Sequence, residues 1–136
     1  MKAELLAPAG NYEKLKTALH FGADAVYLGG KQFSLRTFAD NFTAEELSSA
    51  VQLAHAIHKK VYVTANIYAR NHDFALLSDY FKTLQEIGVD GVIISDPGIV
   101  YIAKKAAPKK AETTEKAEKA EKAEKAEKAA KTAVKK

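Results

Sequence analysis

Several residues with binding chemistry lie where apolar segments of this chain end, and those segments are expected to be strands of one parallel sheet. In such sheets, ligands collect at the carboxyl ends of the strands, and a polar residue that closes a strand is often functional. An arginine at this edge could hold a carboxylate or a phosphate through two parallel hydrogen bonds. The candidate substrate-binding residues are Gly29, Gly30, Arg36, Asn66 and Asp96, and no catalytic residue is assigned.

A simpler structural role competes with binding at most of these positions. The run Gly29-Gly30-Lys31 lacks the GxxxxGK[ST] spacing of a phosphate loop, so a tight turn at a strand end is favoured there. Arg36 fits a loop-anchoring side chain as well as a ligand-binding one. Asp96 precedes Pro97 and is favoured as the cap of the next helix, while a role as general base or ligand stays open.

Histidine and cysteine chemistry is sparse in this sequence. The absence of Cys excludes disulfides, thiolate nucleophiles and cysteine-ligated metal sites within the chain. His55 and His58 are spaced i, i+3, but no carboxylate pattern accompanies them, so no metal site is expected. His72 is interpreted as a loop residue and Asp73 as a helix cap. No nucleophile motif such as Gly-x-Ser-x-Gly occurs, and no cofactor is expected.

The periodicity of apolar residues predicts four strand–helix units. Strands are expected at 4–7, 25–28, 61–68 and 92–94, and helices at 11–22, 44–58, 74–87 and 98–107. Residues 21–26 and 87–92 repeat one pattern of helix end, glycine, aspartate and apolar strand. The predicted fold class is therefore α/β, with four parallel βα units that form half of an eight-unit TIM-type barrel. The exposed concave face of this half-barrel is expected to carry Val26, Leu28, Val63 and Ile93.

A low-complexity, charged tail is expected to follow the half-barrel. The predicted division is a half-barrel over residues 1–107 and a tail over residues 108–136, either disordered or a single helix. From Lys104 onward there are 12 Lys and 6 Glu, whereas the preceding part has 9 Lys and Arg against 11 Asp and Glu. The formal net charge of +4 therefore comes from the tail, and weak contact with RNA is expected only there.

An ordered series of motifs resembles one known family. ELLAPAGN (residues 4–11), GADAVYLGG (22–30), FSLR (33–36) and ADNF (39–42) are similar to the opening of the collagenase-like peptidases of bacteria. The resemblance continues through residues 59–73 and 87–99 and covers roughly residues 3–107. It implies a barrel fold and a family whose members are associated with peptidase activity, hydroxylation of tRNA or ribosomal RNA, and ubiquinone synthesis.

The resemblance also implies that part of the family pattern is missing here. The cysteine-containing signature of the family is expected further along than this chain reaches, so the chain is expected to be a truncated member, inactive by itself. Two alternatives stay open: a non-catalytic half-barrel that associates with itself or another chain through open sheet edges, and a nucleic-acid-binding module that uses the basic tail. No membrane helix or signal peptide is expected, and a cytoplasmic location follows as the default.

Overall fold

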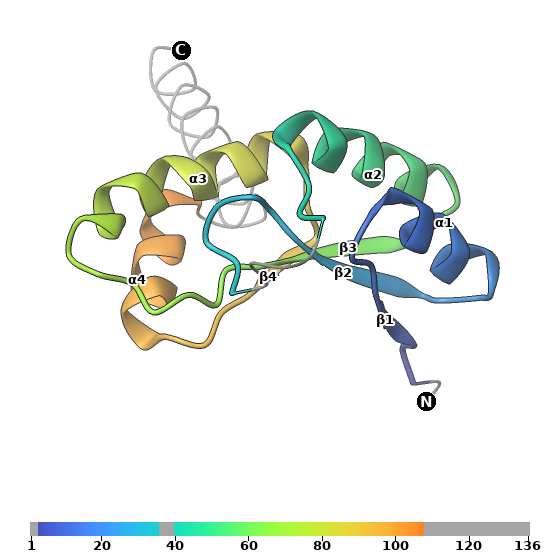
Figure 1. Ribbon diagram of the computed structural model, residues 1–136, viewed down its shortest axis with the longest axis horizontal. Coiled ribbons are helices and arrows are strands. Elements are labelled where there is room, and N and C mark those ends of the chain that lie inside the picture. Colours follow the sequence, from blue (N-terminus) through green and yellow to red (C-terminus); the bar gives the residue numbers. More distant parts are fainter. Residues whose placement is uncertain (1–2, 36–39, 108–136) are drawn as a thin grey trace, which may run out of the picture. The chain divides into compact units, whose positions relative to one another are not determined.

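The computed structural model describes residues 3–35 and 40–107, and these form a parallel α/β unit (Figure 1). Four strands alternate with four helices along the chain. Their bounds are β1 Leu6–Pro8, α1 Tyr12–His20, β2 Ala25–Gly29, α2 Ala44–Ala56, β3 Lys60–Thr64, α3 Asp73–Ile87, β4 Gly91–Ile93 and α4 Pro97–Ala106. The predicted fold class is confirmed in this part of the chain.

The strands follow one another in sequence order across the sheet, β1-β2-β3-β4, and every neighbouring pair is parallel. Within the described residues, β1 and β4 are therefore the two edges of the sheet. Pro8, which cannot donate a backbone hydrogen bond, lies in edge strand β1, where a proline is tolerated. Because neighbouring strands are joined by one helix each, the arrangement is that of consecutive barrel units.

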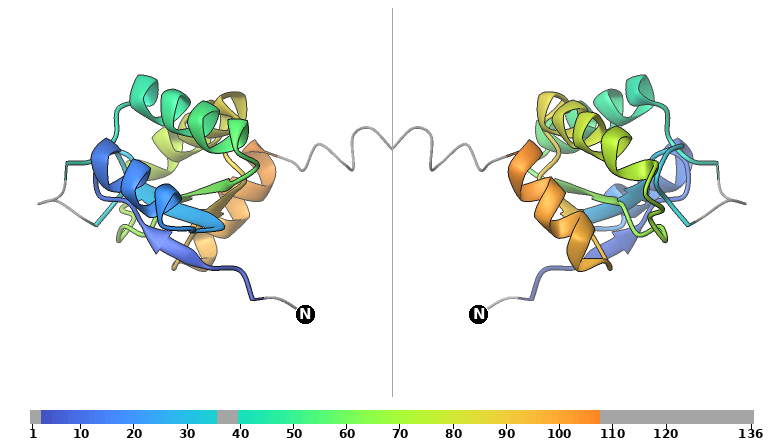
Figure 2. Two further views of the ribbon diagram at one scale, coloured as in Figure 1. Left: turned by 90° about the vertical axis from the view of Figure 1, so that its right-hand side faces the viewer. Right: turned by 90° about the vertical axis from the view of Figure 1, so that its left-hand side faces the viewer.

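Helices α1, α2 and α3 lie on one side of the sheet, as two views show (Figure 1, Figure 2). Val26 pairs in register with Val61, and Leu28 with Val63, and all four side chains are at most 1% exposed. The expectation that Val26, Leu28 and Val63 line the uncovered face is therefore wrong. Side chains alternate between the two faces of a strand, and an apolar run alone does not say which set lies under the helices.

The opposite side of the sheet is called the open face here. By the same register it carries Tyr27, Tyr62 and Lys60, together with Leu6 from β1 and Ile93 from β4. Leu6 is 41% exposed and Ile93 is 39% exposed, so the expectation that Ile93 lies on an uncovered face holds. Among the described elements, α4 does not cover this face, because it packs against α3 and buries Ile99.

The repeated connector between a helix and the next strand is built the same way twice. Gly22 and Gly88 follow the ends of α1 and α3 with φ of 94° and 87°, a backbone conformation that favours glycine. The aspartate two residues later then accepts a hydrogen bond from the backbone within the preceding strand or directly before it. Asp24 accepts from the N–H of Leu5 at 3.0 Å, and Asp90 accepts from the N–H of Val61 at 2.8 Å.

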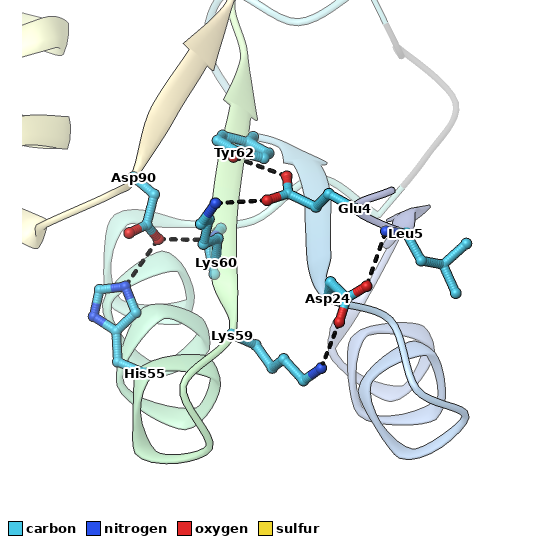
Figure 3. A network of polar contacts seen from close by, with 9 residues as sticks. Glu4, Leu5, Asp24, His55, Lys59, Lys60, Tyr62 and Asp90 are labelled. Carbon is cyan, nitrogen blue, oxygen red and sulfur yellow. Dashed lines mark hydrogen bonds and ion pairs between the residues drawn. The ribbon is translucent and has the colours of Figure 1, made fainter. Parts of the chain in front are cut away.

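Each connector aspartate also pairs with a basic side chain (Figure 3). Asp24 lies 3.0 Å from the ammonium nitrogen of Lys59, and Asp90 lies 2.9 Å from Nε2 of His55. His55, considered as a metal ligand from its spacing, therefore has a structural partner. In both copies of the repeat, the aspartate links a strand, a connector and the end of the neighbouring helix at the amino ends of the strands.

Asn11 and Thr43 cap helices α1 and α2, whereas the predicted cap at Asp73 is wrong. Asn11 accepts from the N–H of Lys14 at 2.9 Å, and Thr43 forms a capping box with Glu46. Asp73 does not cap α3. It is the first residue of the helix, and its carboxylate turns back to accept from the N–H of Arg70 at 2.7 Å.

The third strand is shorter than its apolar sequence predicts. β3 ends at Thr64, although the predicted strand extends to residue 68. Its neighbour β4 ends at Ile93, whose carbonyl accepts from the N–H of Ala65 at 2.9 Å. Beyond this point β4 offers no further strand partner, and a strand needs partners for its backbone groups.

The chain divides into two units, Met1–Ala106 and Ala107–Lys136. The predicted tail at residues 108–136 lies outside the residues that the structure describes. No helix within the described ranges is long and apolar enough to cross a membrane.

Candidate functional site

The loop after β2 folds back onto the carboxyl end of the sheet. The carbonyl of Gly29 accepts from the N–H of Phe42 at 2.9 Å, and the carbonyl of Phe42 accepts from the N–H of Lys31 at 3.0 Å. A side chain at position 29 would place its Cβ 2.6 Å from Oγ of Ser34. Gly29 is therefore required for close packing of this loop, as the prediction of a tight turn at a strand end anticipates.

Ser34 links this loop to the neighbouring strand β3. The hydroxyl of Thr64, at the end of β3, donates to the carbonyl of Leu28 at 3.2 Å. The hydroxyl oxygens of Ser34 and Thr64 are 3.4 Å apart. These contacts place a pair of hydroxyl groups over the carboxyl ends of β2 and β3.

Asn66, two residues after the end of β3, also binds the loop after β2. Its side-chain oxygen accepts from the N–H of Leu35 at 3.3 Å, across 31 positions of sequence. The structure therefore brings Gly29, Gly30 and Asn66 together around one loop. Arg36, the remaining candidate of this loop, lies outside the described residues.

Asp96 has the structural role favoured from the sequence. Its Oδ1 accepts from the N–H groups of Gly98 at 2.6 Å and Ile99 at 3.1 Å, which caps the start of α4. A Cβ on Gly98 would lie 2.9 Å from this oxygen, so a glycine suits the tight cap. Oδ1 is committed to the cap, which leaves the second carboxylate oxygen for the predicted role as a general base or ligand.

A polar cavity of about 660 Å³ opens beside this loop. It lies between the start of α1, the loop after β2 and the start of α2. Its lining offers an ammonium group, two carboxylates, two side-chain amides and two hydroxyls. The lining residues are Asn11, Tyr12, Lys31, Ser34, Asp40, Asn41, Phe42 and Glu46. This mixture of donors and acceptors suits a polar ligand with several hydrogen-bonding groups.

Gly30 is held by a contact that the sequence does not reveal. A Cβ on Gly30 would lie 2.5 Å from the hydroxyl oxygen of Tyr80, which comes from α3. The ring of Tyr80 also lies 5.1 Å from that of Phe33, measured between centroids. Phe33 has φ of 61°, an unfavourable conformation for a bulky residue that its surroundings must hold in place. Tyr80 and Phe33 thus position the loop, and no local sequence signal marks them.

The hydroxyl of Tyr80 is buried without a hydrogen-bond partner in the described part of the chain. Burial raises the pKa of Tyr80 to about 12, because the charged phenolate would lose its hydration there. The ring borders a second, mostly apolar cavity of about 430 Å³ between the loop after β2 and helix α3. This residue is neutral at physiological pH and acts through packing.

No cluster of three or more metal-ligating side chains occurs among residues 3–35 and 40–107. The side chains at the carboxyl edge offer hydroxyl, amide and carboxylate groups for hydrogen bonding.

Comparison with known proteins assigns the chain to a family. The model of peptidase family U32 matches residues 10–136. The chain belongs to peptidase family U32. This confirms the resemblance to collagenase-like peptidases.

The U32 relatives include proteins with different named activities. The chain is 50% identical over 107 residues to tRNA hydroxylation protein P1 of Bacillus subtilis, which covers 79% of this chain and 25% of that protein. It is 38% identical over 108 residues to tRNA hydroxylation protein P of Escherichia coli, covering 79% of this chain and 24% of that protein. A protein named collagenase from Porphyromonas gingivalis is 32% identical over 103 residues, covering 75% of this chain and 25% of that protein. The chain thus spans about a quarter of the length of these curated U32 relatives.

A solved U32 structure shares the fold. The U32 peptidase Mk0906 matches with a TM-score of 0.61 and 16% sequence identity, over 74% of this chain and 44% of that chain. The four βα units described here therefore correspond to less than half of that U32 chain, as expected for part of a TIM-type barrel.

Proposed function

We propose that the chain contributes the substrate-binding carboxyl edge of a U32 protein that takes part in tRNA hydroxylation. The observation that carries this proposal is its 50% identity to tRNA hydroxylation protein P1 of Bacillus subtilis. The matched length, 107 residues, is close to that of the described unit, which contains the loop after β2 and the polar cavity beside it. A cytoplasmic location follows from this proposal, because tRNA is a cytoplasmic substrate.

The polar cavity offers groups that suit an RNA nucleotide. Carboxylate and amide oxygens of Asp40 and Asn41 can accept from a 2′-hydroxyl or from the amino group of a base. The ammonium group of Lys31 can pair with a phosphate oxygen. Such contacts bind and orient a nucleotide, and the oxidation chemistry would come from groups that the described residues do not include.

A chimera tests the proposal directly. Residues 1–107 replace the matching segment of protein P1 in a Bacillus subtilis strain that lacks its own tRNA hydroxylation proteins P1 and P2. Hydroxylated nucleosides in digested total tRNA are then measured by mass spectrometry. We expect the chimera to restore hydroxylation and the Asn66→Ala chimera to lose most of it, because Asn66 holds the loop over the carboxyl edge.

A matched control separates this role from general stability. Lys82 lies on α3 in an exposed ion pair with Asp79 and lines neither cavity beside the loop, so the Lys82→Ala chimera is expected to keep full hydroxylation. Protein levels and thermal unfolding are compared for all chimeras. A chimera that accumulates and folds like protein P1, yet yields no hydroxylated nucleoside, would contradict the proposal.

Peptide hydrolysis is the second candidate, because of the family name and the collagenase relative. We expect the chain by itself to leave gelatin uncleaved, since it has no Cys and no recognised nucleophile motif. Reproducible cleavage by the purified chain, lost when one residue within 1–107 is replaced, would favour the peptidase reading instead.

A further inference from the structure

The open face of the sheet lacks a covering layer in the described unit. Helices α1, α2 and α3 all lie on the other face (Figure 2). Leu6 and Ile93, at opposite edges of the open face, are 41% and 39% exposed. A parallel sheet is normally buried on both faces, so this face and the two edge strands call for a partner.

The strand order determines what kind of partner fits. Within residues 3–35 and 40–107, the order β1-β2-β3-β4 leaves one unpaired edge at β1 and the other at β4, and all strands run the same way. A second copy related by a two-fold axis along the barrel would place its β1 beside β4 of the first copy and its β4 beside β1. Two sets of four strands then make the eight that close a barrel of this architecture.

We propose that the open face binds a second copy of this chain, so that two copies close into an eight-stranded parallel barrel with two-fold symmetry. Closure pairs both edges of each copy and buries the apolar side chains of the open face in one step. It also ends the association at two copies, because a closed cyclic arrangement leaves no free edge.

The polar groups of the open face are arranged in a way that allows burial (Figure 3). Glu4 accepts from the ammonium group of Lys60 at 2.5 Å and from the hydroxyl of Tyr62 at 3.0 Å. The hydrogen bond from Lys60 holds the pKa of Glu4 below its usual range, and Glu4 raises the pKa of Lys60. The cation therefore enters the barrel already neutralised by a carboxylate, as a buried charge requires.

Tyr62 extends this face across the sheet to the edge. A Cβ on Gly91 would lie 3.0 Å from the ring of Tyr62, so the ring lies against the glycine of β4. An aromatic side chain over a glycine of an edge strand gives that edge a continuous apolar surface. The second copy would therefore meet Tyr62 and Ile93 on one side and Leu6 on the other.

The first test is the size of the full chain in solution. Sedimentation equilibrium at tens of micromolar is expected to give twice the mass of one chain. A monomer, or a series of larger species from open head-to-tail pairing, would overturn the proposal. Ile93→Lys, which puts a charge on the open face, should give a monomer, while Leu76→Lys on exposed α3 should leave the dimer unchanged.

The second test does not depend on the fold tolerating a lysine. The chain has no native Cys, so Leu6→Cys and Ile93→Cys place single thiols on β1 and β4. A short bifunctional thiol reagent should join the two variants when they are mixed, because neighbouring strands lie only about 4.8 Å apart. Each variant alone, and mixtures with Ile57→Cys at the end of α2, should remain uncrosslinked. Absence of the mixed product would count against closure.

The third test asks whether the ion pair enters the barrel. Glu4→Gln or Lys60→Met alone should weaken dimer formation by at least about tenfold, since each leaves an unpaired charge or amine to be buried. The double variant should return to within a few-fold of the original affinity. Asp79→Asn, which breaks an exposed pair on α3, serves as control and should change nothing. Single variants with unchanged affinity would show that this network stays in water.

Discussion

Gly30 and Tyr80 meet across the loop after β2, and their contact carries a prediction at the residue scale. Gly30→Ala should destabilise the fold by about 1–3 kcal/mol, because the new Cβ would lie 2.5 Å from the Tyr80 hydroxyl oxygen. The same change in a Tyr80→Phe background should cost less, because the clashing oxygen is gone. Chemical denaturation of the original protein, the two single variants and the double variant gives the coupling energy between Gly30→Ala and Tyr80→Phe. An equal loss of stability from Gly30→Ala in both backgrounds would disprove the contact.

The buried hydroxyl of Tyr80 gives a second residue-scale prediction. Burial raises the pKa of Tyr80 to about 12, whereas an unfolded tyrosine titrates near 10. Between these values the unfolded chain releases a proton that the folded chain keeps, so stability falls by up to ~1.4 kcal/mol per pH unit as pH rises. Tyr80→Phe should remove this part of the alkaline loss and leave stability at pH 7 equal or slightly higher, since the hydroxyl has no partner in the described residues.

The aspartates of the helix-to-strand connectors are expected to stabilise the fold. Asp90 holds both the N–H of Val61 and the side chain of His55, so Asp90→Ala leaves a strand N–H without its acceptor. We expect a loss of about 1–3 kcal/mol. Asp79→Ala is the matched control, because Asp79 forms an exposed i, i+3 pair with Lys82, for which about 0.5 kcal/mol or less is expected. Similar losses for both variants, measured by thermal unfolding, would show that the connector aspartate is not structural.

The whole-molecule prediction concerns the charged tail. Removing residues 109–136 should leave the unfolding midpoint within about 2 °C, since about 1 kcal/mol shifts it by ~4–8 °C in a domain of this size. The tail has no apolar residue larger than Ala before Val134 and therefore little to add to a core. The same truncation should weaken the salt-dependent binding of the chain to RNA, because the excess of Lys lies in the tail. RNA binding whose strength and salt dependence do not change on truncation would show that the tail makes no contact with RNA.

The α/β class, the number of units, the family, and local features such as the cap at Asp96 and the repeated connectors followed from the amino-acid sequence alone. These depend on residues close together in the chain, so backbone geometry and local hydrogen bonding are enough to predict them. The extent of β3 was overestimated, because where a strand ends depends on how far its neighbour β4 continues.

Only the tertiary structure decided which strand face lies under the helices and which residues hold the loop after β2. Val26 and Ile93 look equivalent as apolar strand residues, yet one is fully buried and the other 39% exposed. Likewise, Asn66 meets Leu35 across 31 positions, and Tyr80 meets Gly30 across 50 positions. Such contacts arise from the packing of whole elements against one another. The periodicity of apolar residues in a strand or a helix does not predict them, because it reflects only neighbours within one element.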